Sequence, residues 1–507
     1  MFIKINSAAG LGLDCTLITV EVDISPRWPR YQIVGLPDTA IQEARERIRT
    51  AWKNTDLSFP SNSGVVINLA PADVRKEGAG YDLPMAIGMY FASENRDDIK
   101  VDDAIFVGEL ALDGSLRHTT GILPIAIFAK AKGYRRLFVP EVNAREASII
   151  TGIDTYPIRS LRQLIEHLIG VTAIAPVPPH DLEQWFGEAH SEMNLMYIKG
   201  QEFAKRALEI AASGAHNILL SGPPGSGKTL LARTLPSILP PLTVAEAIEV
   251  TKIYSVAGLL PNDRPLIVER PFRSPHHSAS GVALVGGGTF PRPGEISLAH
   301  RGVLFLDEFP EFPRQVLETL RQPLEDGIVT ISRAQGTIAF PARFTLVASQ
   351  NPCPCGYASD PERRCLCSPM HVAKYQKKVS GPLLDRIDLH VEVPRVKFEK
   401  LSKEELSEPS KKVAERVLLA RQRQRERFKN SPIATNTEMK NKDIKEHCRL
   451  NEQSIELLRQ AVTQMRLSAR SYYRILKLGR TIADLGGSDA IQTEHIAEAL
   501  QYRAKGE

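Results

Sequence analysis

The segment 217–235, NILLSGPPGSGKTLLARTL, constrains the fold most, because a short apolar run, a glycine-rich loop and a helical pattern follow one another directly. The loop fits the pattern G-x-x-x-x-G-K-[ST], in which glycines let backbone N–H groups face phosphates at the start of a helix. The predicted nucleotide-binding residues are Gly222, Pro223, Pro224, Gly225, Ser226, Gly227, Lys228 and Thr229. Lys228 is expected to reach the β- and γ-phosphates of ATP, and Thr229 to bind Mg²⁺.

A second apolar run, GVLFLDEF over 302–309, ends in two acids. Ligands of open α/β sheets bind at the carboxyl ends of the strands, so Asp307 and Glu308 are expected beside the phosphate loop. Asp307 suits the role of holding Mg²⁺, and Glu308 suits that of polarising the attacking water. Two acids after a strand are by themselves an ordinary solvated turn. The complete phosphate loop upstream makes catalysis the better prediction.

The length and composition indicate a multidomain globular protein. The chain has 507 residues, 43% of them hydrophobic and 24% charged, which corresponds to about three domains. No window offers the ~20 uncharged apolar residues of a membrane span, and the start of the chain lacks the long apolar core of a signal peptide. We therefore expect a cytoplasmic protein with no membrane partner.

Proline- and glycine-rich stretches and changes in the strand and helix patterns divide the chain into three predicted domains and a linker. Short β-like runs alternate with helical patterns over 1–172, which predicts an α/β N-terminal domain. A proline-rich stretch over 173–195 indicates a linker. A second α/β domain is predicted over 196–395, and a helical, strand-poor domain over 396–507. The expected fold class is therefore multidomain α/β with a C-terminal helical lid.

Three motifs together resemble one superfamily. The phosphate loop, the run VLFLDE and the asparagine that closes FTLVASQN, Asn351, resemble an AAA+ ATPase. The segment 271–302, PFRSPHHSASGVALVGGGTFPRPGEISLAHRG, resembles the Mg-chelatase-like branch, in particular the bacterial YifB/ComM family, and the match extends nearly from end to end. The resemblance implies a homo-oligomeric ring, expected to be a hexamer, with ATP and Mg²⁺ at the subunit interfaces.

The resemblance also implies roles for single residues. Asn351 corresponds to a sensor that orients the lytic water near the γ-phosphate. Arg386, in SGPLLDRIDLHVEV, corresponds to an arginine finger offered to the neighbouring subunit's ATP. Arg470, in LSARSYYRIL, corresponds to the second sensor on the lid, and Arg474, one turn later, is its nearest competitor. Candidate contacts to the adenine base are Tyr197 and Ile198.

The N-terminal domain resembles the proteolytic domain of Lon-type proteases, through EGAGYDLPMAIGM and the segment 106–143. The activity of that family depends on a Ser–Lys dyad. The resemblance places the nucleophile position at Met85 and the lysine position near Leu123. A thioether cannot be deprotonated to attack a carbonyl, and leucine cannot act as a base. We therefore expect a Lon-like fold without protease activity, serving ring assembly or contact with DNA or a partner.

Two insertions are candidate DNA contacts. The runs IVTIS and GTIAF flank a predicted turn, and the resemblance to MCM-type helicases implies a channel-facing hairpin with Arg333 at its tip. An ordinary surface hairpin remains the alternative. The insertion that carries Arg273 and Arg292 is predicted to be a second channel-facing or intersubunit loop. Its adjacent His276 and His277 lack the spacing of a zinc site.

The basic surplus of the chain lies in its last fifth, notably in ARQRQRERFK over 420–429. A solvated helix face and a nucleic-acid contact explain this run equally well.

The family resemblance implies a function for the whole chain. We expect an ATP-driven ring motor on single-stranded or branched DNA, a helicase that promotes branch migration in homologous recombination and natural transformation. The alternatives are a chelatase-type or protein-remodelling ATPase, and a ring scaffold that binds ATP without turnover. Glu308 and Arg386 both argue against the scaffold.

Four of the six cysteines lie in NPCPCGYASDPERRCLC, over 351–367. Cys353, Cys355, Cys365 and Cys367 form C-x-C-x9-C-x-C, which supplies the four thiols of a tetrahedral zinc site but not the commoner C-x-x-C pairs. Structural thiols and a redox role remain open, and the ligand count favours zinc. A closed four-thiolate site has no open position for catalysis, so any zinc here is expected to be structural.

Overall fold

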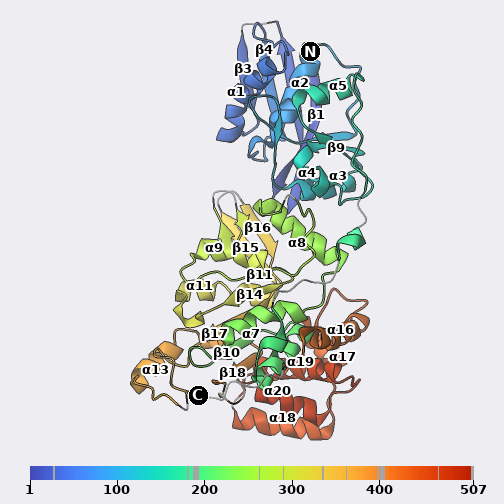
Figure 1. The fold of residues 1–507 in the computed structure, drawn as a ribbon. Helices are drawn as coiled ribbons and strands as arrows, with labels where there is room; N and C mark the ends of the chain where they lie inside the picture. The colour runs from blue at the N-terminus through green and yellow to red at the C-terminus, as the bar shows by residue number, and fades with distance from the viewer. Residues whose placement is uncertain are drawn as a thin grey trace. The chain divides into compact units, whose positions relative to one another are not determined.

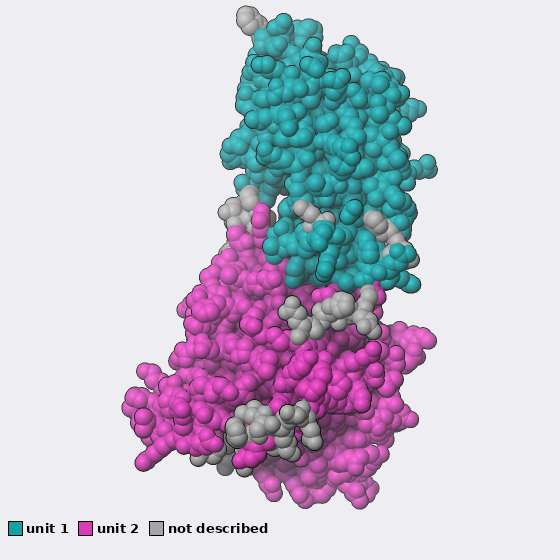
Figure 2. All heavy atoms as spheres, viewed as in Figure 1, with its two compact units in different colours: residues 1–185, 244–268 teal, residues 186–243, 269–507 magenta. Residues whose placement is uncertain are grey.

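The computed structural model contains two compact units, one of Met1–Trp185 with Val244–Val268 and one of Phe186–Thr243 with Glu269–Glu507 (Figure 2). The structure describes residues 1–26, 29–179, 182–186, 193–261, 263–288, 291–333, 336–360, 362–396, 399, 406–465 and 467–503. Both units combine helices and strands, which confirms the predicted α/β class (Figure 1).

The first unit contains two main sheets. One has the order β1-β2-β4-β3, with antiparallel pairs except for the parallel pair of β3 and β4. The other, β5-β8-β9, is parallel. Their bounds are β1 Phe2–Leu11, β2 Asp14–Ser25, β3 Arg30–Val34, β4 Gly64–Ala70, β5 Ala104–Phe106, β8 Arg136–Pro140 and β9 Asp154–Ile158, and a small hairpin joins β6 Glu109–Leu110 to β7 Leu116–Arg117.

Six α-helices complete the described part of this unit: α1 Thr39–Asn54, α2 Asp82–Ser93, α3 Ile122–Ala131, α4 Glu141–Ala147, α5 Leu161–Leu168 and α8 Val244–Ala257. Helix α8 comes from far downstream in the sequence. The Ser255 hydroxyl donates to the buried carboxylate of Glu146, and the Gly121 amide donates to the Ser255 carbonyl, 3.1 Å away. The predicted boundaries do not include this return of the chain, and the four-part division stays a prediction.

The positions that a Lon-type dyad would occupy are apolar and closed to solvent. Met85 on α2 and Leu123 on α3 are both 0% exposed. Met85 belongs to the hydrophobic core of the first unit. Neither position offers a nucleophile or a base.

The second unit is built on a five-stranded parallel sheet of order β11-β14-β17-β10-β18. The strands are β10 Ile218–Ser221, β11 Phe272–Arg273, β14 Val303–Leu306, β17 Thr345–Gln350 and β18 Leu389–Glu392. Strand β17 lies between β10 and β14, so the segments after these three strands emerge side by side at the carboxyl edge of the sheet.

Helices and two hairpins surround this sheet. Their bounds are α6 Glu202–Gly214, α7 Lys228–Thr234, α9 Gly281–Val285, α10 Glu295–Leu298, α11 Arg314–Glu318, α12 Arg321–Asp326, α13 Pro369–Gln376, α14 Gly381–Leu384, β12 Gly286–Gly287, β13 Arg292–Pro293, β15 Ile328–Arg333 and β16 Gly336–Pro341. The C-terminal helices are α16 Ser410–Arg427, α17 Asn441–His447, α18 Glu452–Gln464, α19 Ala469–Leu485 and α20 Thr493–Gln501, which confirms the predicted helical region.

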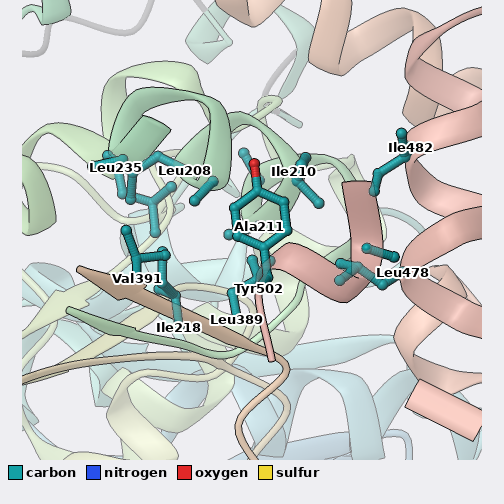
Figure 3. Close-up of a cluster of buried hydrophobic side chains, with 14 of the residues drawn as sticks. Leu208, Ile210, Ala211, Ile218, Leu235, Leu389, Val391, Leu478, Ile482 and Tyr502 are labelled. Atoms are coloured by element: carbon teal, nitrogen blue, oxygen red, sulfur yellow. The ribbon is translucent and has the colours of Figure 1, made fainter. Parts of the chain in front are cut away.

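The C-terminal helices share one hydrophobic core with the sheet. Ile218 and Leu389 from the sheet, Ala211 from α6 and Leu478 from α19 belong to the same buried cluster (Figure 3). Tyr502 joins it after α20, and its ring stacks on Phe203 with centroids 4.8 Å apart. Burial at about 25 cal/mol per Å² of apolar surface therefore ties the lid to the nucleotide-binding sheet.

No helix in the described ranges is both long enough and apolar enough to cross a bilayer.

Candidate nucleotide-binding site and its arginine partners

The phosphate loop connects β10 to α7, as the sequence predicts. Gly225 and Gly227 have φ values of 76° and 93°, which residues with a Cβ atom rarely adopt. Gly222 is required for a different reason, since a Cβ there would lie 2.1 Å from the Val393 carbonyl oxygen. The loop can therefore adopt this curled conformation only because these positions are glycine.

Lys228 is folded back onto its own loop. Its ammonium donates to the carbonyl oxygens of Gly222 and Pro223, at 2.7 and 2.9 Å, and to Asn351 Oδ1 at 3.3 Å. Burial lowers the pKa of Lys228 from 10.5 to about 8, against the opposing charge of Asp307. A triphosphate would replace neutral carbonyls with anionic oxygens, so this lysine is preorganised for a phosphate ligand.

Asp307 and Glu308 follow β14 at the same edge of the sheet. Asp307 Oδ2 accepts from the Thr229 hydroxyl at 2.9 Å, and Asp307 Oδ1 accepts from the Ser349 hydroxyl. This hydroxyl and carboxylate form an oxygen donor set of the kind that Mg²⁺ prefers, and Mg²⁺ takes its remaining ligands from water and phosphate. The residues present therefore fit the implied Mg²⁺.

Glu308 is held in an unusual conformation. Its φ is 52°, in the left-handed region, and its Oε2 lies 3.2 Å from His277 Nδ1. The sequence analysis placed His277 in an insertion and gave it no role at Glu308. No spacing rule connects the two residues, because they come from different strand-to-helix connections.

Asn351 completes the carboxyl edge after β17, where its side chain meets Lys228. Ser349 is a residue that the sequence analysis missed. It lies two positions before Asn351, and side chains two apart on a strand share a face, so the period-2 rule could have found it. Gln201 was also missed: its Nε2 donates to the Ser226 carbonyl at 3.3 Å and to the Pro394 carbonyl at 2.6 Å.

The two candidate adenine contacts differ in accessibility. Tyr197 is 67% exposed at the end of a short 3-10 helix, Leu195–Tyr197. Ile198 is buried in the core that the lid and the sheet share. Tyr197 is therefore available to stack on a base, whereas Ile198 could only form the floor of such a site.

Arg386 lies at the opposite end of the same sheet. It precedes β18, and its carbonyl accepts from the Asn217 side chain, directly before β10. Four residues of β10 then separate it from the phosphate loop, about 13 Å at ~3.3 Å per residue. The proposed finger therefore lies at the end of the sheet opposite the phosphate loop of its own chain.

Arg470 lies beside Arg386. Both guanidinium groups contact the carboxylate of Glu325 on α12, Arg386 through a close ion pair and Arg470 at 3.4 Å. The hydrogen bond from Arg386 holds the pKa of Glu325 below its usual value. The structure thus brings together two residues that the sequence analysis assigned separate roles.

Arg474 is engaged elsewhere. Its Nη1 donates to the Arg386 carbonyl at 2.7 Å and forms a close ion pair with Asp388, which is 2% exposed. Burial alone would raise the pKa of Asp388, but the charge of Arg474 and a bond from His216 lower it. Arg474 therefore neutralises a buried acid, whereas the half-exposed Arg470 pairs only with an exposed carboxylate in the described part of the chain, and this favours Arg470 as the arginine that meets a nucleotide.

The cysteine-rich loop gathers all four thiols. The Sγ atoms of Cys353, Cys355, Cys365 and Cys367 lie within 4.8 Å of one another, and none forms a disulfide. Three of the separations are 3.4, 3.6 and 3.6 Å. A tetrahedron with Zn–S bonds of ~2.3 Å has sulfur atoms about 3.8 Å apart, so the cluster fits zinc.

This loop packs directly on the phosphate loop. A Cβ at Gly356, whose φ is 84°, would lie 2.5 Å from Pro224 Cδ. The backbone between the two cysteine pairs therefore supports the phosphate loop from behind.

The three arginines predicted to contact DNA differ in their surroundings. The predicted hairpin exists as β15 and β16, paired from Ile328↔Pro341 to Arg333↔Gly336, although the side chain of Arg333 lies outside the described part of the structure. Arg273 is bound by both carboxylate oxygens of Glu295, at 2.6 and 2.7 Å. Arg292 is exposed on β13.

Arginines of the basic run over 420–429 bind groups within the same chain. Arg421 donates to the Ala212 carbonyl of α6, and Arg423 to the Asp484 carbonyl of α19. Arg427 binds the Asp484 carboxylate, which is also buried. Three of its arginines therefore fasten α16 to neighbouring helices, a use that neither sequence interpretation considered.

The parallel sheet, the phosphate loop, the acidic pair and the asparagine directly after the intervening strand together define the P-loop ATPases of the AAA+ class. Residues 194–401 match the family described as "Magnesium chelatase, subunit ChlI", residues 20–143 match "Subunit ChlI of Mg-chelatase", and residues 407–503 match its C-terminal region.

Proteins of similar sequence identify the family within this class. The chain is 44% identical over 506 residues to the competence protein ComM of Haemophilus influenzae, covering 99% of this chain and 97% of that protein. It is 42% identical over 501 residues to YifB of Escherichia coli, covering 99% and 96%. The 38 kDa magnesium-chelatase subunit of Cereibacter sphaeroides is 29% identical over 171 residues, covering 31% and 51%. The chain therefore belongs to the YifB/ComM family of Mg-chelatase-like AAA+ proteins.

Proposed function

We propose that the chain is an ATP-hydrolysing ring motor that acts on single-stranded or branched DNA, a helicase that promotes branch migration during homologous recombination and transformation. One observation carries the ring: the phosphate loop and the two arginines lie at opposite ends of one sheet. A complete catalytic site then needs the arginines of a second subunit, and a head-to-tail arrangement of this kind closes into a ring. The proposed ring is a hexamer in the cytoplasm.

Each chain contributes two half-sites in this proposal. At the carboxyl edge, Lys228 leaves its carbonyl partners for the β- and γ-phosphates, and Thr229 and Asp307 hold Mg²⁺, which bridges phosphate oxygens and neutralises developing charge. Glu308 polarises the attacking water, which Asn351 orients. At the amino edge, Arg386 and Arg470 meet the γ-phosphate of the neighbouring subunit.

Two observations support DNA as the proposed substrate. The name of the Haemophilus relative associates that protein with competence, and the chain carries the β15–β16 hairpin with Arg333 at the end of β15, which we propose faces the channel of the ring. A basic tip suits a phosphate backbone better than an apolar polypeptide.

The test is the steady-state ATPase rate with branched DNA, single-stranded DNA or an unfolded protein, combined with the native mass with and without ATP. Stimulation by DNA and a six-subunit mass in ATP support the proposal. Stimulation by unfolded protein alone would instead identify a protein-remodelling ATPase, and a monomeric mass at full activity would exclude the ring.

We further propose that the four cysteines bind one structural zinc ion. The cluster brings four Sγ atoms within 4.8 Å of one another, and Gly356 between the two cysteine pairs packs on Pro224 of the phosphate loop. Zinc quantification on wild type and on a variant with all four cysteines replaced by serine tests this. One zinc per wild-type chain and none in the variant is expected, and equal metal content in both would exclude the site.

A further inference from the structure

Arg386 is unlike an arginine finger that is presented to a neighbour: its side chain is only 10% exposed, and both of its terminal nitrogens already have partners within the chain. Nη2 is paired with Glu325 and Nη1 donates to the Pro382 carbonyl at 2.7 Å. Its Nε is buried with no hydrogen-bond partner in the described part of the chain. An arginine that serves a neighbour's γ-phosphate has to leave at least one of these contacts first.

Glu325 is the group that holds both arginines. Its carboxylate is half-exposed and lies between two guanidinium groups that would otherwise repel each other. A γ-phosphate is also an anion, so the carboxylate and the phosphate compete for the same two cations. The resting contact therefore opposes transfer of the arginines to the neighbouring site.

Helix α12 connects Glu325 to the hairpin. The helix ends at Asp326 and β15 begins at Ile328. The Gln322 side chain donates to the Thr330 hydroxyl at 3.3 Å, which joins the helix to the hairpin a second time. Only a few residues separate the hairpin from Glu325. A force that a ligand exerts on the hairpin is therefore transmitted to helix α12.

The same helix is tied to the arginine side. Arg321 Nη2 donates to the Ser380 hydroxyl at 3.2 Å, directly before α14. Arg321 also pairs with Glu318 at 2.6 Å. Helix α12 thus touches both the hairpin and the segment that delivers Arg386.

We propose that Glu325 is a latch, a positioning residue that holds Arg386 and Arg470 away from the neighbour's γ-phosphate until the β15–β16 hairpin is loaded and α12 shifts. The latch deepens the proposed function, and its DNA-dependent part rests on that function. Its effect on the unstimulated rate rests only on the proposed ring ATPase and not on DNA as the substrate.

The experiment compares Glu325→Gln with wild type in the full-length protein, using ATPase rates without and with branched DNA. The variant keeps the size of the side chain and removes the charge, and half-exposure means that the fold should persist, which an unchanged thermal midpoint checks. A latch predicts an unstimulated rate at least about fivefold higher and a DNA-stimulation ratio near one, because a coupling of this kind is worth about 1–3 kcal/mol.

Glu456→Gln is the matched control. Glu456 on α18 is 52% exposed and pairs with Arg459 at 3.0 Å, so the variant removes the same charge from a similarly exposed ion pair without touching Arg386, Arg470 or helix α12. Its unstimulated rate should stay within about twofold of wild type. The double variant Glu325→Gln with Arg386→Ala should be as slow as Arg386→Ala alone, because the gain acts through the arginine. Additive effects would show that Glu325 acts elsewhere and would overturn the latch.

An unstimulated rate that is unchanged or lower in Glu325→Gln, at an unchanged thermal midpoint, would also overturn the latch. The failure of the DNA proposal has a different signature. In that case DNA does not stimulate wild type, yet Glu325→Gln still raises the unstimulated rate in an Arg386-dependent way.

Discussion

The two ends of the parallel sheet differ in how their charged groups are satisfied. At the carboxyl ends, Lys228 donates to neutral carbonyl oxygens and Asp307 accepts from hydroxyl groups. Because these partners are neutral, Lys228 and Asp307 can exchange them for a ligand without leaving a partner's charge buried and unpaired. At the amino ends, Arg386 and Arg470 rest on a carboxylate of opposite charge. The carboxyl end is poised to accept a ligand, whereas the amino end is held closed.

Arg386→Ala should produce the largest effect. An arginine finger contributes about 10³–10⁵ to the rate, because it stabilises charge that develops only in the transition state. ATP affinity should change little, since the residue lies far from its own phosphate loop. Steady-state kinetics and equilibrium nucleotide binding measure the two quantities, and a large loss of affinity would place Arg386 at its own site instead.

Glu308→Gln should lower the hydrolysis rate by about 10²–10⁴-fold with ATP still bound, because an amide cannot polarise the attacking water as a carboxylate does. A single-turnover assay on preloaded protein measures this directly. Near-normal turnover would remove Glu308 from the mechanism.

Arg470→Ala and Arg474→Ala sharpen the comparison within one helix. Arg474→Ala leaves Asp388 buried without its main charge partner, which should lower the free energy of unfolding by about 3–5 kcal/mol. Arg470 is 44% exposed, so Arg470→Ala should hardly change stability and should lower ATPase activity instead. Urea denaturation and kinetics on both variants test the assignment, and the reverse pattern would exchange the two roles.

The pH dependence of ATP binding probes Lys228. Because its pKa is about 8 in the free protein, the neutral amine accumulates above pH 8, and binding ATP then requires uptake of a proton. The Kd for ATP should be flat below pH 8 and should rise above it, approaching about tenfold per pH unit.

Lys228→Arg is the control for this prediction, because a guanidinium stays charged over the whole range. Its Kd should be weaker but independent of pH between 7 and 9.5. A flat profile in wild type would show that Lys228 keeps its proton in the free protein.

The position of the groups at the carboxyl end could be predicted from the sequence because each group belongs to a local motif. A phosphate loop, two acids after a strand and an asparagine after another strand are each defined by a few neighbouring residues, and parallel strands bring them together. The amino end was harder. Glu325 has no motif, and its contacts with Arg386 and Arg470 join residues 61 and 145 positions away. Only the folded structure, in which α12 brings Glu325 to the segment before β18 and to the start of α19, reveals them.

The return of α8 to the first unit was likewise missed, because a 14-residue helix carries no sign of the core that it joins. The arginines of 420–429 show the same limit: composition gives the charge but not the carbonyl or carboxylate that receives it.

Complementation between Arg386→Ala and Glu308→Gln tests the central claim, that one sheet contributes its two ends to two different sites. Each variant alone should be nearly inactive. In co-assembled oligomers, a chain with Arg386→Ala but an intact Glu308 can sit beside a chain that offers an intact Arg386, and random mixing makes about a quarter of the sites complete. The account predicts recovery toward about a quarter of the wild-type ATPase rate, and a mixture no faster than its separate components would contradict it.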